Sequence, residues 1–317
     1  MQIHVILNRH GGTLKTTDLD WLADFVKAEF ALHGHEVSVE VLDGAALAEA
    51  IEAAARREAV DVLIVGGGDG TVSSAAAALE GRRTALGILP AGTMNLFARS
   101  LQIPLDLNAA VAALAAGRVV DVDIGMANGQ PFVHQFAVGL HARLVRIRER
   151  INYGSRYGKI LASIRATLMV LQRLPAIELE IEIDGVSQRI KTPAVAVSNN
   201  LYGDGHMPFA DNPQGGALGV YICKSRNPPT VAKLAMDILL GTWRRNPALE
   251  VHTAQSVTVH FSGRTRHKRA VLDGELCDLE PRTVVKTLPR QLRVLVPSDA
   301  DYHAPVPPTA EEPPSKG

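Results

Sequence analysis

Apolar and polar positions follow different patterns in the two halves of this chain. In the first half, apolar runs at residues 3–7, 60–65 and 86–89 each end in a turn that contains glycine, and a stretch with helical spacing follows each turn. Continuous apolar runs of this length are typical of parallel strands that are buried on both faces. The first half is therefore predicted to be a doubly wound α/β domain, in which strands and helices alternate.

A helix signal separates the first two strands of this domain. Thr17 and Asp20 open an amphipathic segment, and Gly34 closes it. Its expected apolar face consists of Trp21, Leu22, Phe25, Val26 and Phe30. A strand at 37–42 and an alanine-rich helix at 45–57 are expected to follow.

The second half is predicted to be rich in strands. Ile177, Leu179, Ile181 and Ile183 alternate with acidic residues, and Asp184-Gly185 then marks a hairpin turn. Further strands are expected near 194–198, 219–223, 257–261, 270–272 and 292–296. We divide the chain into an α/β domain at 1–124, a β-rich domain at 125–297 and a proline-rich, acidic tail at 298–317 that is predicted to be disordered.

Charge is distributed unevenly, although the net charge of the 317 residues is zero. Residues 1–124 contain 9 basic and 16 acidic side chains, whereas residues 125–298 contain 23 and 13. A basic second half indicates an anionic partner, either a membrane or a nucleic acid. The aromatic content of 4% and the lack of a recognised binding motif argue against nucleic acid. The densest basic cluster, at 264–269, is expected to contact anionic lipid or phosphate.

Targeting signals and cysteines point to the cytoplasm. The N-terminal apolar run is too short for a secretory signal, and no apolar run reaches the ~20 residues that span a bilayer. Two cysteines are too few to frame a secreted domain. We expect a cytoplasmic protein that associates peripherally with the inner face of the membrane.

One glycine-rich turn carries the strongest chemical signal. It lies between a predicted strand and a predicted helix and comprises Gly66, Gly67, Gly68, Asp69, Gly70 and Thr71. Glycines allow close approach of the backbone, and N–H groups at a helix start point at an anion, so this turn is predicted to hold phosphate. A carboxylate beside phosphate indicates Mg²⁺, which makes Asp69 the candidate metal ligand. The dinucleotide fingerprint fails at Thr71, and the P-loop motif is absent.

Two more turns are expected at the same edge of the sheet, because parallel strands end on one side. The first comprises Asn8, Arg9, His10, Gly11 and Gly12. The second contains Gly92, Thr93 and Asn95, and Asn95 is a candidate helix cap. Together the three turns predict a nucleotide-binding crevice.

Transfer of phosphate to a hydroxyl also needs a base near the acceptor. Asp273 and Glu275 flank Gly274 after an apolar segment near the C-terminus. In an extended strand, both carboxylates would point to the same side. A hairpin turn explains Asp-Gly-Glu equally well on its own.

The three turns and the late Asp-Gly-Glu, in this order, resemble the diacylglycerol kinase catalytic-domain family of lipid kinases, which is related to sphingosine and ceramide kinases. The family motifs are N-P-x-S-G, G-G-D-G-T, P-x-G-T-x-N-D-F-A and D-G-E. The resemblance implies a nucleotide-binding domain and a β-sandwich-like lipid-substrate domain, with the active site in the cleft between them. It implies ATP and Mg²⁺ as cofactors, and Glu275 or Asp273 as proton acceptor. The implied substrate is a membrane lipid, either diacylglycerol or ceramide or a sphingoid base.

The chain departs from the family pattern at five positions. Leu96 replaces the aspartate after Asn95, and His134 stands where asparagine is common. Gly11 replaces the serine of the first motif. Gly215 and Gly219 replace two acids of a second, structural Mg²⁺ site, so that site is not expected here.

Other functions remain open at this stage. An NAD kinase would use the same G-G-D-G turn, but its second acidic motif is not found. A non-catalytic nucleotide-sensing or nucleic-acid-binding protein would use the basic half. For the membrane, two basic amphipathic segments at 158–174 and 229–245 are candidate surface helices.

Overall fold

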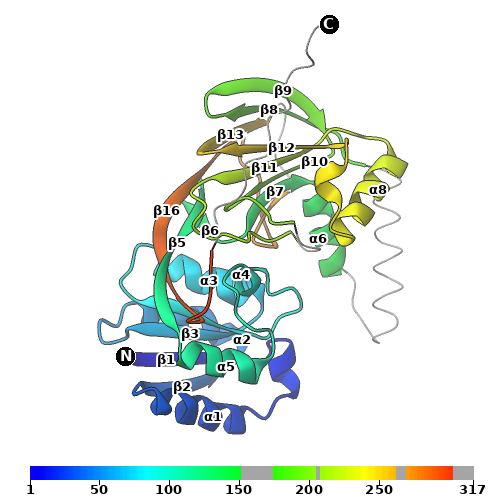
Figure 1. Ribbon diagram of the computed structural model, residues 1–317. Coiled ribbons are helices and arrows are strands. Elements are labelled where there is room, and N and C mark those ends of the chain that lie inside the picture. Colours follow the sequence, from blue (N-terminus) through cyan, green and yellow to red (C-terminus); the bar gives the residue numbers. More distant parts are fainter. Residues whose placement is uncertain (151–173, 205–207, 262–268, 303–317) are drawn as a thin grey trace, which may run out of the picture.

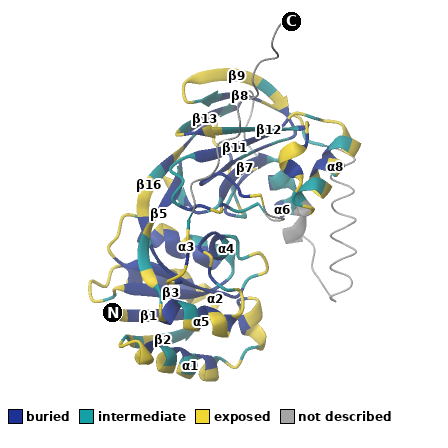
Figure 2. Ribbon diagram, viewed as in Figure 1, coloured by how far each residue is buried: buried dark blue, intermediate teal, exposed yellow. Residues whose placement is uncertain are grey.

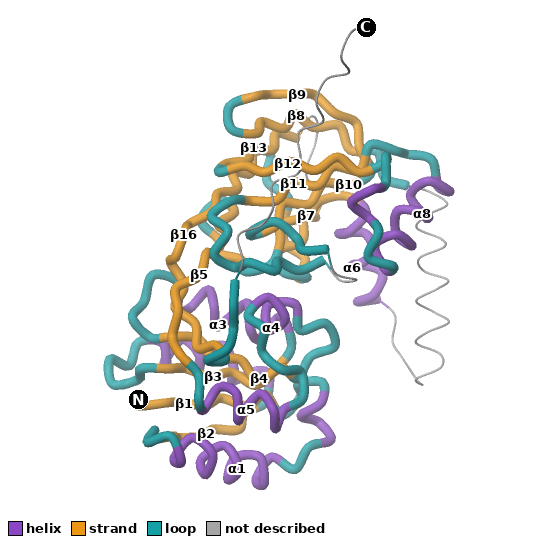
Figure 3. Tube along the Cα trace, in the orientation of Figure 1, coloured by secondary structure: helices purple, strands orange, loops and turns teal. Residues whose placement is uncertain are grey.

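A computed structural model describes residues 1–150, 174–204, 208–261 and 269–302. Figure 1 shows two parts, one with helices around a parallel sheet and one built mainly of strands. The same contrast appears in the colouring by secondary structure in Figure 3. The predicted α/β and β-rich organisation is thus confirmed. Within the described ranges, no helix combines the length and apolar character that crossing a bilayer requires.

The N-terminal part is centred on four parallel strands in the order β2-β1-β3-β4. They are β1 (Gln2–Asn8), β2 (Glu36–Leu42), β3 (Val62–Gly67) and β4 (Ala85–Pro90). Every residue of β3 and β4 is buried, as their continuous apolar runs predict. All four strands run in the same direction, so their carboxyl ends meet at one edge.

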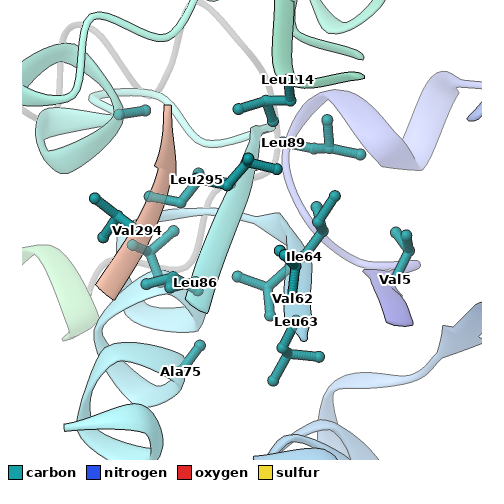
Figure 4. Close-up of a cluster of buried hydrophobic side chains, with 14 of the residues drawn as sticks. Val5, Val62, Leu63, Ile64, Ala75, Leu86, Leu89, Leu114, Val294 and Leu295 are labelled. Atoms are coloured by element: carbon teal, nitrogen blue, oxygen red, sulfur yellow. The ribbon is translucent and has the colours of Figure 1, made fainter. Parts of the chain in front are cut away.

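Helices cover this sheet. They are α1 (Leu19–Leu32), α2 (Gly44–Ala55), α3 (Asp69–Leu79), α4 (Leu96–Ser100) and α5 (Leu107–Ala115), with a short 3-10 helix η1 (Thr13–Thr16) before α1. Helix α1 packs against α5, and α2 packs against α3. Figure 4 shows strand side chains such as Val62 and Leu86 in one apolar cluster with Ala75 of α3 and Leu114 of α5.

Two details of α1 differ from expectation. Its N-cap is Asp18, whose carboxylate accepts hydrogen bonds from the N–H groups of Asp20 and Trp21. The prediction that Trp21 belongs to the buried face is wrong, because 52% of this residue is exposed. Trp21 stacks on Phe25 at a centroid distance of 5.3 Å and shields it from the outside.

A long antiparallel ribbon connects the two parts. It consists of β5 (Arg118–Ala127) and β16 (Arg282–Val296), which pair along almost their whole length. The last residues of β16 return to the N-terminal sheet, where Val294 pairs with Leu86 of β4. This return places residues from the far end of the chain in the N-terminal core, so strand pairing alone does not mark a domain boundary at residue 124. That boundary stays a prediction.

Two sheets build the second part. One continues from β16 through β13 (Ser256–Phe261) and β8 (Ile177–Ile183) to β9 (Val186–Thr192), and β6 (Gln130–Phe132) pairs with β5. The other contains β12 (Leu249–Ala254), β11 (Leu218–Cys223), β10 (Ala194–Ser198), β7 (Gln135–Gly139), β14 (Arg269–Leu272) and β15 (Glu275–Asp278) in that order. Their facing side chains form one apolar cluster, seen as dark strands in Figure 2. The predicted Asp184-Gly185 hairpin turn is confirmed, with positive φ at both residues.

Among the residues that the structure describes, three helical segments flank the second sheet on one side (Figure 1). They are α6 (Leu140–Arg150), α8 (Pro228–Leu239) and the short η2 (Trp243–Arg245). The segment expected at 229–245 therefore begins as a helix but ends at Leu239. The candidate helix at 158–174 lies almost wholly outside the described residues, as do residues 264–268 of the basic cluster.

The predicted tail is partly ordered. Ala300 is buried, and the Tyr302 hydroxyl donates to the carbonyl of Leu101. Arg118 donates to the carbonyl of Ala300 at 2.8 Å. The prediction of disorder from residue 298 is therefore wrong for residues 298–302, because these contacts attach them to the N-terminal core. Residues 303–317 lie outside the described ranges.

Candidate active site

Three glycine turns meet at the carboxyl edge of the parallel sheet. The Ala91 N–H donates to the carbonyl of Gly67, and the Thr13 N–H donates to that of Ala91, each at 2.9 Å. A Cβ added at Gly92 would stand 2.7 Å from the Cα of Gly68, and one at Gly12 would stand 2.2 Å from the Ala91 oxygen. The turns touch through their backbones, so only glycine fits at Gly12 and Gly92.

Helix α3 begins in the middle of these turns and presents an uncapped N-terminus. Gly68 occupies its N-cap position and provides no side-chain acceptor. The first N–H groups of a helix have no partner within the helix, and together with the helix dipole they attract anions. The open space beside Gly68 and these free donors fit a phosphate group.

Asp69 has a structural role that the sequence did not reveal. Its carboxylate accepts hydrogen bonds from the N–H groups of Asn95, at 3.1 Å, and Leu96, at 2.7 Å. Asp69 therefore caps α4, and the expectation that Asn95 caps it is wrong. Asn95 adopts a left-handed backbone, and its side chain bonds the backbone of Gly92 instead.

The structure does not bring all residues of the first turn into the crevice. Arg9 and His10 point toward Asp43, at 3.5 and 3.4 Å, on the outer side of the turn. Asn8 contacts the side chain of Thr71, and Thr71 is buried. Gly66 and Gly67 likewise lie within the buried end of β3.

A cleft of about 480 Å³ lies where these turns face the second part. Its N-terminal wall includes Gly12, Gly68, Asp69, Gly70, Gly92 and Thr93. Its opposite wall includes His134, Gln135, Asp273, Gly274 and Glu275. The glycine turns and the Asp-Gly-Glu segment, about 200 residues apart in sequence, thus line one cavity.

Asp273 is buried and fully hydrogen-bonded. Its carboxylate accepts from the N–H groups of Val133, His134 and Gln135 and from the hydroxyl of Ser73, at 2.8 to 3.0 Å. These four donors occupy the four lone-pair positions of a carboxylate. Burial raises the pKa of Asp273, and the four hydrogen bonds oppose that rise.

Glu275 has a different environment, although it is only two residues away. Asp273 and Gly274 both have positive φ and form the turn between β14 and β15, so the strand alternation expected for the two acids does not apply. Glu275 is exposed, and its Oε1 lies 2.8 Å from where a Cβ on Gly70 would stand. Its carboxylate therefore faces the first turn of α3 across the cleft.

Replacing Asp273 by Asn should destabilise the fold. The amide group would turn N–H donors toward donors of the 133–135 backbone, and each unsatisfied buried group costs about 1–3 kcal/mol. Urea denaturation should show a loss of that order. Asp278→Asn, at an exposed residue of the same hairpin, is the control and should change little. Equal stability of both variants would contradict this assignment.

A stack of aromatic rings extends from the cleft into the second part. His134 stacks on Tyr202 at 5.5 Å, and Tyr202 stacks on Tyr221 at 4.6 Å. The Tyr202 hydroxyl donates to Gln135 Oε1 at 2.7 Å, and Gln135 Nε2 lies 3.3 Å from His141 Nε2. Desolvation by burial and repulsion from His141 lower the pKa of His134 from its ordinary value of 6.5 to about 3.

His134 should make stability depend on pH. Between about pH 6.5 and 3 the unfolded chain protonates this ring while the folded protein keeps it neutral, so stability falls as the pH falls. Because His134 is only partly buried, we expect a loss of about 1–2 kcal/mol between pH 7 and 5. Urea denaturation at both values should show a smaller loss for His134→Asn. The same loss in both proteins would exclude His134 as its source.

Several residues at the cleft had no signal in the sequence. Ser73 lies inside α3, where nothing marked it as a partner of Asp273. Gln135, His141 and Tyr202 lie outside the strands that the sequence predicted for the second half. Ordinary polar residues in the second part gain their position from the packing of its sheet against the helices.

Neighbouring side chains stand close to the two glycines that replace the acids of the second Mg²⁺ motif. A Cβ at Gly215 would lie 2.8 Å from Asn200 Oδ1, and one at Gly219 would lie 2.7 Å from Ser198 Oγ. Acidic side chains would therefore clash at both positions in this arrangement. That no second Mg²⁺ binds stays a prediction.

Comparisons with known proteins agree with this geometry. Residues 2–127 match the family described as "Diacylglycerol kinase catalytic domain", and residues 136–296 match "YegS C-terminal NAD kinase beta sandwich-like domain". Diacylglycerol kinase of Bacillus subtilis (strain 168) is 30% identical over 86% of this chain and 90% of its own length. An uncharacterized protein of Synechocystis, sll0036, is 28% identical over 74% of this chain, which spans only 54% of that protein.

A solved structure shows the same fold. A diacylglycerol kinase of Bacillus anthracis strain Sterne has a TM-score of 0.67 at 18% identity, with 95% of this chain and 98% of that chain covered. Both parts of the chain match, in the order in which the family has them. The chain therefore belongs to the diacylglycerol kinase catalytic-domain family of lipid kinases.

Proposed function

We propose that this protein is an ATP- and Mg²⁺-dependent lipid kinase that transfers the γ-phosphate of ATP to a hydroxyl of a membrane lipid. The observation that carries the proposal is that the cleft with the glycine turns and the two acids borders a second, apolar pocket. The two cavities share Gln135, His141 and Pro208 as lining residues. A lipid has the same two-part character, with a polar head that reacts and apolar chains that do not.

The apolar pocket has a volume of about 270 Å³ and lies between the second sheet, α6 and α8. Its lining includes Leu140, Leu144, Val195, Val231, Leu234 and Trp243. Burial of apolar chain in such a pocket contributes about 0.8 kcal/mol per CH₂. This contribution favours a lipid acceptor over NAD, whose groups are mostly polar.

In this proposal the cleft residues have different roles. Glu275 accepts the proton of the acceptor hydroxyl, since its carboxylate is exposed to the cleft, whereas Asp273 positions the backbone at 133–135. The N–H groups at the start of α3 hold the phosphates. Asp69 would hold Mg²⁺, which neutralises phosphate charge when bound, and one or two carboxylates are the usual protein share of such a site. Among the described residues, no group of three or more His, Cys, Asp or Glu forms a metal cage.

The experiment is a kinase assay with the purified protein, labelled ATP and Mg²⁺. Micelles containing diacylglycerol, ceramide or sphingosine are compared with NAD as acceptor. We expect phosphate in the lipid fraction, with diacylglycerol as the first candidate because the Bacillus subtilis relative is named for it. Phosphorylation of NAD with no lipid product would refute the proposal in favour of an NAD kinase.

We further propose that α8 contacts the membrane. One face of this helix lines the apolar pocket through Val231 and Leu234. Met236 and the following Leu240 are 54% and 58% exposed, and the side chain of Lys233 is 68% exposed. Exposed apolar and basic side chains at the pocket would bring a bilayer to the site where its lipid enters.

Replacing Met236 and Leu240 together by Ser should weaken binding to anionic vesicles roughly tenfold, because two apolar side chains no longer enter the bilayer. Sedimentation measures this, and added salt should also reduce binding by screening the basic residues. Leu32→Ser with Leu105→Ser is the matched control, since both leucines are exposed on the N-terminal part. If both pairs bind alike, α8 is not the membrane contact.

A further inference from the structure

A second hollow lies at the opposite end of the parallel strands from the cleft. Its volume is about 810 Å³, and it is lined by residues at the starts of β1, β3 and β4. Five arginines contribute to its lining: Arg56, Arg57, Arg82, Arg83 and Arg293. We call this region the arginine hollow.

These arginines come from three separate segments of the chain. Arg56 and Arg57 follow the end of α2, Arg82 and Arg83 lie in the turn between α3 and β4, and Arg293 belongs to β16. The first 124 residues are acidic overall, with 9 basic and 16 acidic side chains. Four of those nine basic residues nevertheless gather here, and the fold adds a fifth from the far end of the chain.

The hollow has more positive charge than its own acids can balance. Glu58 and Asp61 are its acidic lining residues. Asp61 also accepts a hydrogen bond from the N–H of Gln2 at 2.8 Å. Five arginines thus line the hollow together with two acids, and like charges gathered in one hollow repel one another.

The partners of the arginines leave two guanidinium groups available. Arg56 pairs with Glu52 at 3.0 Å, and Arg82 donates to the carbonyl of Ala78. Arg293 donates to the carbonyl of Arg83 at 2.6 Å and lies 3.7 Å from Asp121. Across the ranges that the structure describes, the side chains of Arg57 and Arg83 form no ion pair and no hydrogen bond.

We propose that the arginine hollow binds a soluble small molecule that carries two or more phosphate groups. The planar guanidinium group donates two parallel hydrogen bonds to a phosphate, so arginine clusters are typical of phosphate sites. The volume falls within the range of small-molecule sites. A bound polyanion would relieve the repulsion among the arginines.

The position of the hollow favours a soluble ligand over a lipid headgroup. Met1, at the N-terminus, is one of the residues that line the hollow. Figure 1 shows the N-terminus and α8 on opposite sides of the molecule. If α8 faces the bilayer, as proposed above, the arginine hollow faces away from it. The site is also separate from the cleft, because it uses the other ends of the same strands.

Calorimetric titration with tripolyphosphate tests the proposal. We expect the wild-type protein to bind in the arginine hollow, and Arg57→Ser with Arg83→Ser to weaken that binding at least about tenfold. Both arginines are exposed and without side-chain partners among the described residues, so the variant should fold, which its melting temperature checks. Arg189→Ser with Arg226→Ser makes the same charge change in the second part and should leave binding unchanged. Equal affinity and stoichiometry in all three proteins would overturn the proposal.

Two further binding measurements identify the source of the phosphate. The Gly68→Val variant removes phosphate binding in the cleft. If this variant still binds tripolyphosphate, and loses that binding when Arg57→Ser and Arg83→Ser are added, the binding belongs to the hollow. This result is independent of kinase activity and therefore of the proposed function. Vesicles containing phosphatidic acid provide the other measurement. If the serine variant loses vesicle binding but keeps tripolyphosphate binding, the ligand is a lipid headgroup and the soluble-ligand proposal is wrong.

Discussion

Replacement of Glu275 by Gln is expected to lower kcat by roughly 10²–10⁴-fold, the range for loss of a general base. Glutamine keeps the size and shape of the side chain but cannot accept a proton from the lipid hydroxyl. The affinity for ATP should change little, because in the proposed function backbone N–H groups at the start of α3 hold most of the phosphate. Steady-state kinetics with a short-chain diacylglycerol would separate the effects on kcat and KM.

A matched control for this variant lies in the same segment of the chain. Glu280 is exposed and accepts a hydrogen bond from Asn128, away from the cleft. Glu280→Gln should therefore keep wild-type turnover. Near-normal kcat in Glu275→Gln would show that Asp273-Gly274-Glu275 is only a hairpin turn.

Replacement of Gly68 by Val is expected to weaken ATP binding by two orders of magnitude or more, because a branched side chain would occupy the space for phosphate. The protein itself can accommodate the change. A Cβ on Gly68 meets only the Cα of Gly92, at an ordinary contact distance of 3.5 Å. Calorimetric titration with a non-hydrolysable ATP analogue would measure the loss.

The neighbouring glycine provides the contrast. A Cβ on Gly67 would stand 2.5 Å from Thr71 Oγ1, so Gly67→Val should lower the melting temperature as well. Gly68→Val should keep a melting temperature close to that of the wild-type protein. Unchanged affinity in Gly68→Val would place the nucleotide elsewhere.

Local patterns were sufficient for much of the fold. The runs that became β3 and β4 are apolar at nearly every position, which suits strands buried on both faces. The alternation that became β8, followed by Asp184-Gly185, predicted a hairpin that the structure contains. These signals are local, because each depends on neighbours within a few residues.

Side-chain roles at the site depended on contacts between distant segments. Asn95 looked like the cap of α4, yet it is the carboxylate of Asp69 that caps this helix. Asp69 stays the candidate Mg²⁺ ligand. Arg9 and His10 belong to the first of the three glycine turns, but their side chains point to its outer side. No spacing within the chain encodes such directions, since they are set by how the turns pack on one another.

The sequence by itself therefore determined the alternation of strands and helices in the first half, the hairpin at Asp184-Gly185, the three glycine turns and the family, because all of these rest on short-range patterns and motifs. Only the tertiary structure separated Asp273 from Glu275. A turn with positive φ buries Asp273 among four donors from α3 and the 133–135 segment and leaves Glu275 open to the cleft. The arginine hollow likewise exists only in the folded chain, because β16 returns Arg293 to residues that precede it by about 200 positions.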